Sequence, residues 1–152
     1  MSSKVPTYVF RGTTKGFPGN KNSMEIPYAC TSWHPVKALW FALACYRFSP
    51  EKAVVYIALT ERLAGIEIGK NVPPLCDIES EIAFFIQPTL FYHYCEGYIH
   101  VTDFQSILKD FGIDGYRVVD RENLTKICGE TLPLTFRKIA ELVKATIPFL
   151  KK

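Results

Sequence analysis

Thr31 and Ser32 stand between a strand-like run and a helix-like run in the stretch YACTSWHPVKALWFA, residues 28–42. The residues before them predict a short strand over residues 26–30. After them, apolar residues recur at helical spacing within residues 34–48, at Val36, Leu39, Trp40, Leu43 and Ala44. Only two small polar residues therefore stand between the two elements, where a loop would normally be longer and more polar.

The hydroxyl groups of Thr31 and Ser32 suit the start of that helix. Serine and threonine are preferred N-cap residues because their oxygens accept hydrogen bonds from the first amide groups of a helix. Pro35 fits the first turn, where a missing N–H costs nothing. A helix N-terminus also attracts anions, so capping and contact with an anionic ligand are compatible at these two residues.

The rest of the chain mixes strand and helix signals and contains no internal repeat. Apolar and β-branched runs bounded by turn residues predict further strands over residues 7–11, 52–60, 80–87, 97–102 and 114–120. The segment FYHY, residues 91–94, is expected to be a partly buried strand or turn.

Two more helices are expected near the end of the chain. One covers residues 103–112, with Asp103 as its cap and Gly112 at its end. The other covers residues 133–150, where an apolar stripe runs through Phe136, Ile139, Leu142 and Val143. Together these segments predict an α+β protein of five to six strands and about three helices.

The composition is that of one globular domain, expected to span residues 1–152. Hydrophobic residues make up 48% of the chain and aromatic residues 14%, which argues against a disordered protein. No apolar run approaches the roughly 20 residues of a membrane span, and the N-terminus lacks a signal-peptide core. We therefore expect a soluble, cytoplasmic protein. The net charge of +3 tolerates an anionic ligand but is modest for a nucleic-acid-binding module.

The cysteines and histidines predict neither disulfides nor a metal site. An odd number of cysteines without a C-x-x-C pair is typical of reduced thiols. No histidine has metal-ligand spacing to them, so no metal is expected. The residues concerned are Cys30, Cys45, Cys76, Cys95 and Cys128, and His34, His93 and His100.

Arg11 is expected at the end of the first strand, followed by Gly12 and Thr13. An arginine in such a place is most often a surface cation. Here the glycine would let the backbone approach a ligand closely, and the guanidinium can hold a phosphate group through two N–H groups. A ligand that carries a pyrophosphate would suit this stretch.

Glu79 and Glu81 occupy alternate positions at the start of the apolar segment IAFFI. Residues two apart on a strand share a face, so two carboxylates would point the same way. Such a pair raises the pKa of one member and can supply a base or stabilise developing positive charge. The alternative is a solvated start of a strand.

The ordered set FRGT, YACTS and ESE resembles the R-S-E signature of mono-ADP-ribosyltransferases of the cholera-toxin-like branch. The run TSWHPVKALWFA is similar to the stretch that follows the second motif in such enzymes, and FGIDGYRVV is similar to their late strand. The resemblance extends from about residue 8 to residue 119. It implies a single small ADP-ribosyltransferase-like domain with a split, mostly antiparallel β core.

The resemblance also implies the chemistry of the site. Arg11, with Gly12 and Thr13, would hold NAD through its phosphates or the adenine-side ribose. Thr31 and Ser32 would line the nicotinamide pocket. From the sequence, Trp33 and Trp40 are expected in the core and the pocket wall, where Trp33 could stack on the nicotinamide ring. Glu81 and Glu79 would be catalytic.

Glu81 would bind the ribose and stabilise an oxocarbenium-like transition state, in which positive charge develops as the C–N bond breaks. Glu79 would orient or deprotonate the acceptor. In this family the E-x-E pattern often accompanies arginine acceptors. NAD would be the co-substrate, and no metal is implied.

Two features depart from the family pattern. Cys30 replaces the first serine of the S-T-S motif, and a thiol is a weaker hydrogen-bond donor. Arg11 also lies near the start of the sequence, so the helical lobe that precedes it in many toxins is not expected here. An NAD glycohydrolase and a ligand-binding module with weakened catalysis therefore remain alternatives to a transferase.

The expected partner is a macromolecular acceptor, with protein favoured over nucleic acid and no membrane involved. Protein arginine, another side chain, nucleic acid and a small molecule all remain open as acceptors. A toxin or effector role would add delivery into another cell and a neutralising antitoxin or immunity protein.

Overall fold

The computed structural model describes residues 6–19, 28–68, 81–113, 123, 126 and 134–152. Within them, five strands form one sheet in the order β4-β2-β1-β3-β5, and every neighbouring pair is antiparallel. The strands are β1 (Tyr8–Thr14), β2 (Ala29–Ser32), β3 (Ala53–Leu59), β4 (Glu81–Phe84) and β5 (Gly97–His100). The protein is therefore mixed α+β.

Four α-helices accompany the sheet in the described residues. They are α1 (Pro35–Tyr46), α2 (Pro88–Tyr94), α3 (Val101–Asp110) and α5 (Phe136–Thr146). Two 3-10 helices, η1 (Thr60–Leu63) and η2 (Ile147–Phe149), follow β3 and α5. No helix in these parts of the chain is long and apolar enough to cross a membrane.

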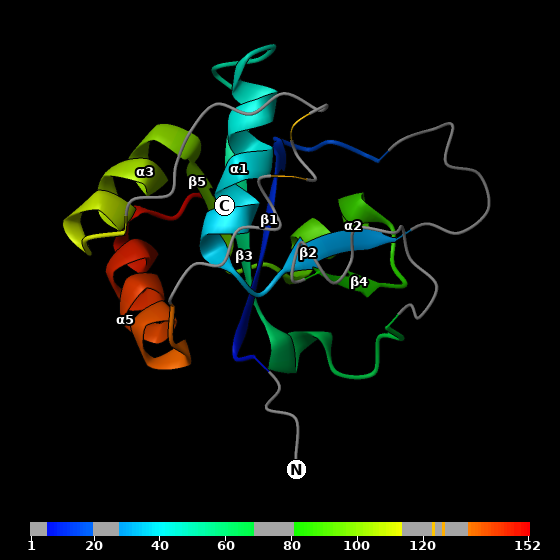
Figure 1. Cartoon of the computed structure of the whole chain (residues 1–152). Coiled ribbons are helices and arrows are strands. Elements are labelled where there is room, and N and C mark those ends of the chain that lie inside the picture. The colour runs from blue at the N-terminus through cyan, green and yellow to red at the C-terminus, as the bar shows by residue number, and fades with distance from the viewer. Residues whose placement is uncertain (1–5, 20–27, 69–80, 114–122, 124–125, 127–133) are drawn as a thin grey trace.

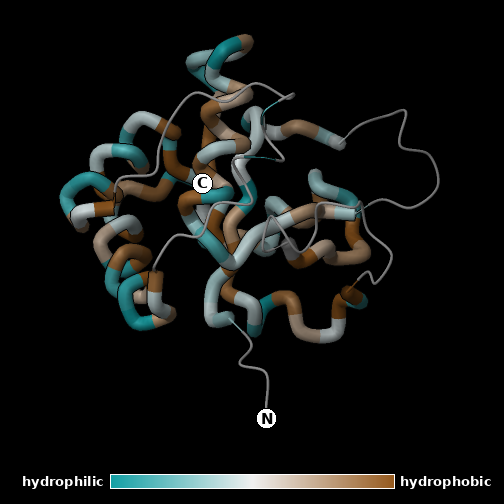
Figure 2. The backbone as a smooth tube through the Cα atoms, viewed as in Figure 1, coloured by the Kyte–Doolittle hydropathy of each residue, from teal (hydrophilic) through white to brown (hydrophobic). Residues whose placement is uncertain are grey.

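The two faces of the sheet carry separate hydrophobic cores. Helices α1, α3 and α5 cover one face, with α1 lying directly over β1 and β3 (Figure 1). Hydrophobic and hydrophilic residues alternate along α3 and α5, so each helix buries one side and exposes the other (Figure 2). The opposite face packs against α2 and η1 through a smaller cluster that includes Phe84, Phe91 and Leu63.

Gly12 lets α1 lie against the sheet. A side-chain carbon at this position would overlap the carbonyl oxygen of Ala38 and lie 2.8 Å from the Ala42 amide nitrogen. The backbone of α1 therefore occupies the space that any larger residue would need. We expected this glycine to let the chain approach a ligand; in the structure the helix backbone occupies the space beside it.

Strand β1 is longer than the predicted strand over residues 7–11. It continues through Gly12, Thr13 and Thr14, which pair with Val55, Val54 and Ala53 of β3. The β-branched threonines favour extended backbone, and the long partner strand supplies hydrogen bonds for them. Arg11 consequently lies in the middle of a strand, opposite Tyr56, and not at its end.

Strand β2 is displaced toward the C-terminus relative to the prediction over residues 26–30. It includes both Thr31 and Ser32, and the N-cap of α1 is His34. Pro35 occupies the first turn as predicted. Thr31 and Ser32 are therefore the last residues of the strand, because β4 pairs with β2 as far as residue 32.

The predicted helix over residues 34–48 and the strand over 52–60 are confirmed as α1 and β3. The expectation for residues 91–94 is wrong, since they belong to α2. Asp103 does not cap α3; the helix begins earlier, and the His100 side chain accepts the capping bond from Thr102 N–H. Phe136 is exposed, although the remaining predicted apolar stripe of α5 is buried.

The edge strand β4 is shorter than the predicted strand over residues 80–87, and Phe85 just beyond it is 44% exposed. The strand predicted over 114–120 lies outside the described residues. The described strands all belong to one sheet, so a division of the core into two β layers is not seen among them.

Replacing Gly12 with alanine tests the contact between β1 and α1. We expect Gly12→Ala to lower the free energy of unfolding by about 2–4 kcal/mol, since the helix must move or the strand must bend. Gly112→Ala is a suitable control, because Gly112 has a φ of 71° but no atom near the added methyl. That change should cost only about 1 kcal/mol. Denaturant unfolding would measure both, and equal losses would contradict the packing role of Gly12.

Candidate functional site

The residues singled out from the sequence come from three neighbouring strands. Strand β2 lies between β1 and β4, and Ser32 is the register partner of both Phe10 and Glu81. Arg11 follows Phe10 directly. The backbone therefore brings positions 11, 32 and 81 to adjacent places on the sheet, although 70 residues of chain separate the first from the last.

Arg11 is half-buried and makes two hydrogen bonds. Its Nε donates to the Tyr92 hydroxyl at 3.2 Å, and its Nη1 donates to the carbonyl oxygen of Cys30 at 2.9 Å. The guanidinium carbon lies 6.0 Å from the centre of the Tyr92 ring. Arg11 is thus neither a loop residue nor a freely solvated surface cation, because α2 and β2 hold its side chain.

Tyrosines around Arg11 form a cluster that sequence reasoning missed. Tyr92 of α2 stacks on Tyr56 of β3 with ring centres 4.0 Å apart and 15° between their planes. The ring centres of Tyr98 in β5 and Tyr56 lie 5.6 Å apart. The Lys15 Nζ atom lies 4.8 Å from the centre of the Tyr98 ring. Tyr92 was missed because the helix that carries it, α2, has only seven residues, too few for a clear apolar pattern. The proline in its first turn is the one local sequence signal for this helix.

Thr31 and Ser32 use their hydroxyl groups to fasten the end of β2. Thr31 Oγ1 donates to the carbonyl oxygen of Ile82 in β4 at 2.7 Å. Ser32 Oγ accepts from the His34 N–H at 3.0 Å, just before α1 begins. Both side chains are 4% exposed. They therefore tie β4 and α1 to β2, which is a structural role that leaves little surface for ligand contact.

The two other residues of the predicted NAD-contacting set also have packing roles. Thr13 is buried within β1. Trp33 follows β2 and packs against the larger core, with its ring 5.5 Å from that of Phe136 at the start of α5. Trp33 thus helps to hold α5 in place. Trp40 is fully buried in the core, as predicted.

The structure describes the position of Glu81 in the sheet but does not describe Glu79. Glu81 is the first residue of β4 and is opposite Ser32. Glu79 lies outside the described residues. The expectation that two carboxylates share one face therefore rests on the sequence.

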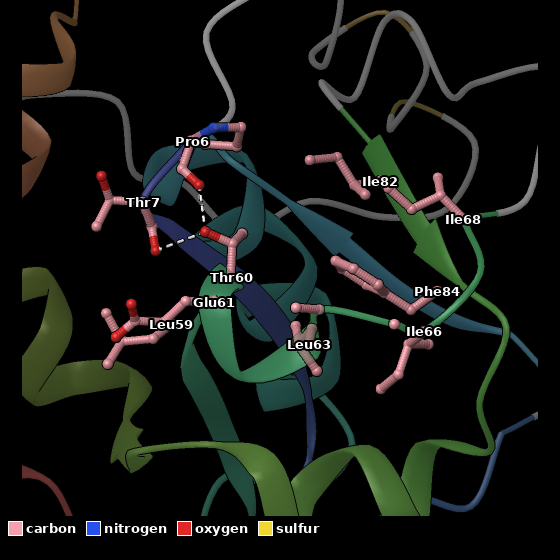
Figure 3. A pocket seen from close by; sticks show the side chains of 12 residues that line it. Pro6, Thr7, Leu59, Thr60, Glu61, Leu63, Ile66, Ile68, Ile82 and Phe84 are labelled. Atoms are coloured by element: carbon pink, nitrogen blue, oxygen red, sulfur yellow. Dashed lines mark hydrogen bonds between the residues drawn. The ribbon is translucent and has the colours of Figure 1, made fainter.

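A pocket of about 580 Å³ opens on the face of the sheet opposite α1 (Figure 3). Ile82 and Phe84 of β4 form one wall, and the segment after β3 forms the other. That second wall consists of Leu59, Thr60, Glu61, Leu63, Ala64, Gly65, Ile66 and Ile68, while Pro6 and Thr7 close the end. The lining is mostly aliphatic, and among the described residues Glu61 is the only charged one that lines the pocket.

Thr60 connects one wall of the pocket to the two residues that precede β1. Its hydroxyl group bonds to the carbonyl oxygens of Pro6 and Thr7, as the dashed lines in Figure 3 show. Arg11, Thr31 and Ser32 do not line the pocket. Ile82 joins the two regions, because it lines the pocket and is the register partner of Thr31.

Burial shifts two titratable groups near Arg11. Removal from water raises the pKa of the Cys95 thiol from 9.0 to about 12, and the positive charge of Arg11 opposes this only in part. Burial also raises the pKa of Tyr56, although a hydrogen bond from the Gly16 N–H works in the opposite direction. Both groups are therefore neutral at physiological pH.

Within the described residues, no group of three or more His, Cys, Asp or Glu side chains could hold a metal ion. Comparisons with models of protein families, with curated proteins and with solved structures found no match to this chain.

The raised pKa values predict a loss of stability at alkaline pH. Between about pH 9 and pH 12 the unfolded chain loses the Cys95 proton while the folded protein keeps it. The free energy of unfolding should then fall with rising pH, by up to about 1.4 kcal/mol per pH unit for this proton.

Cys95→Ala should make that fall shallower, and adding Tyr56→Phe should reduce it further. Denaturant unfolding from about pH 8 to pH 10.5 would measure the slopes. Cys45→Ala, which removes a cysteine from the other face of the sheet, serves as the control. An identical slope in the wild type and in Cys95→Ala would show that this thiol does not retain its proton.

Proposed function

We propose that the protein is an NAD-dependent mono-ADP-ribosyltransferase. The observation that carries the proposal is the strand register, in which Ser32 is opposite both Glu81 and Phe10, the residue before Arg11. The three motifs of the R-S-E signature were identified from their order in the sequence alone. Their occurrence on three adjacent strands supports a common site. Paired residues share a face of the sheet, so positions 10, 32 and 81 lie on the face of α1 and Arg11 lies on the other; bound NAD would therefore have to pass around the start of β4.

The proposed reaction breaks the bond between nicotinamide and ribose and transfers ADP-ribose to an acceptor. Positive charge develops on the ribose as this bond breaks. A carboxylate at Glu81 would stabilise that charge, and it would do so more strongly in the transition state than in bound NAD. Glu81 is therefore the residue to which we assign the largest effect on the rate.

The pocket next to β4 has a suitable size for part of the co-substrate. Its volume of about 580 Å³ falls within the range of about 300–1,000 Å³ common for small-molecule sites. We assign the nicotinamide end, whose ring is cationic in NAD and neutral once released, to this pocket, which is lined by Ile82 and by the carboxylate-bearing Glu61. Glu81 directly precedes Ile82 at the start of β4. In this arrangement the pocket residues after β3, and not Trp33, would contact the nicotinamide ring.

Arg11 is the candidate for the phosphate groups. Thr7, directly before β1, lines the pocket, and Arg11 is four residues further along the chain, about 13 Å at the rise of a strand. An extended dinucleotide can span this distance. The two hydrogen bonds of Arg11 use two of the five N–H donors of a guanidinium, so other donors remain for an anion within the described surroundings.

The acceptor is proposed to be a macromolecule, with a protein favoured, and Glu79 is assigned to it. The fold proposed for the whole chain is that of an ADP-ribosyltransferase, with the five-stranded antiparallel sheet as its core. A toxin or effector with a neutralising protein partner is consistent with this activity and is part of the proposal.

Glu81→Gln tests the proposed mechanism. It keeps the size of the side chain and removes its charge, so release of nicotinamide from NAD should fall by about two to three orders of magnitude. Glu51→Gln, in the exposed turn before β3, should retain the wild-type rate. Thermal unfolding of both variants would establish that they remain folded. Unchanged NAD turnover in Glu81→Gln would refute the assignment of this residue.

Glu79→Gln tests the assignment of the acceptor. Transfer of label from NAD to protein should fall sharply, while slow hydrolysis of NAD by water should largely remain, because water needs less help from a base. Parallel assays of labelled protein and released nicotinamide would separate the two. Equal loss of both activities would argue that Glu79 contacts NAD or supports the fold.

A further inference from the structure

The Tyr92 hydroxyl group lies between Arg11 and the chain that follows β1. It accepts from Arg11 Nε at 3.2 Å and donates to the carbonyl oxygen of Phe17 at 2.7 Å. We propose that Tyr92 is a positioning residue that holds the Arg11 guanidinium ready for the diphosphate of a dinucleotide. This inference deepens the proposed function and rests on it for the identity of the ligand.

The Tyr92 ring is itself held in place. It stacks face to face on Tyr56, with ring centres 4.0 Å apart. The Tyr56 hydroxyl accepts the Gly16 N–H at 2.9 Å, while Tyr92 bonds to the neighbouring Phe17. Two stacked tyrosines from α2 and β3 thus bind consecutive residues of one turn. The hydroxyl that meets Arg11 therefore has a fixed place on this face of the sheet.

The acceptors that hold Arg11 are neutral. Tyr92 supplies a phenol oxygen and Cys30 supplies a backbone carbonyl, so neither cancels the charge of the guanidinium. Glu96, which follows Cys95 near this cluster, pairs with Arg62 at 3.0 Å. Within the described residues, Arg11 is thus a half-buried cation without a carboxylate partner. Such a group attracts an anion more strongly than one already in a salt bridge.

Anchoring at Nε and Nη1 also lowers the cost of binding. A free arginine side chain must give up several rotamers when it binds a phosphate, whereas a side chain held at two points has already lost them. The remaining N–H groups then face the ligand in one orientation. Removing the Tyr92 hydroxyl should leave the charge in place but free the guanidinium to move.

Nuclear magnetic resonance of the arginine Nε–H groups tests the proposal in the full chain. The Arg11 signal is identified by its loss in Arg11→Lys. In the wild type we expect slow exchange of this proton with water and a shift on addition of inorganic pyrophosphate. In Tyr92→Phe, which keeps the ring stack, exchange should be about tenfold faster and pyrophosphate binding about tenfold weaker, as expected for loss of one charge-assisted hydrogen bond.

Tyr98→Phe is the matched control. Its ring belongs to the same cluster, but its hydroxyl group makes no hydrogen bond within the described residues, so both measurements should match the wild type. With NAD, Tyr92→Phe should raise KM about tenfold and leave kcat nearly unchanged, a split that general loosening of the fold would not produce.

Two results would overturn the positioning role. One is equal Nε–H exchange and equal pyrophosphate affinity in the wild type and Tyr92→Phe; the other is a wild-type Arg11 signal that pyrophosphate does not shift. If pyrophosphate shifts the Arg11 signal and Tyr92→Phe weakens this binding, but NAD neither binds nor is cleaved, the role of Tyr92 stands and the proposed enzymatic function fails.

Discussion

The contact between Gly12 of β1 and the backbone of α1 determines how the rest of the fold is arranged. The Ala38 carbonyl and the Ala42 amide lie where a side chain at position 12 would be, so the helix axis passes very close to the central strand. This close approach lets α1 cover β1 and β3 together, and α3 and α5 then pack beside it. The opposite face of the sheet is left for α2, η1 and the pocket.

The two faces of the sheet differ in what they carry. The face under α1 carries the larger core, with Trp40 and Phe10 fully buried. The other face carries Arg11, its tyrosine partners and a pocket whose walls come from a short strand and a connecting segment. Alternation along β1 explains how one strand serves both faces, because Phe10 points into the large core while Arg11 points away from it. A site on this face can change its side chains without disturbing the main core.

The sequence predicted elements better than boundaries or contacts. The apolar period of α1 and the β-branched run of β3 were sufficient, because both elements are long and strongly patterned. The ends of β1 and β2 were misplaced, because pairing with β3 and β4 carries them into residues that look like turns. The seven-residue helix α2 is too short for a clear period. The bond from Arg11 to Tyr92 joins residues 81 positions apart, so no local pattern could have predicted it.

The two hydroxyls at the end of β2 link the two faces that the sheet otherwise separates. Thr31 donates to the Ile82 carbonyl of β4, and Ile82 also lines the pocket. Ser32 accepts a hydrogen bond from the N–H of His34, the residue that precedes α1. Short polar residues are needed here because both bonds are made inside the protein, where an unpaired hydroxyl or amide would be costly. The position of Glu81, opposite Ser32, therefore depends on the same junction that starts the main helix.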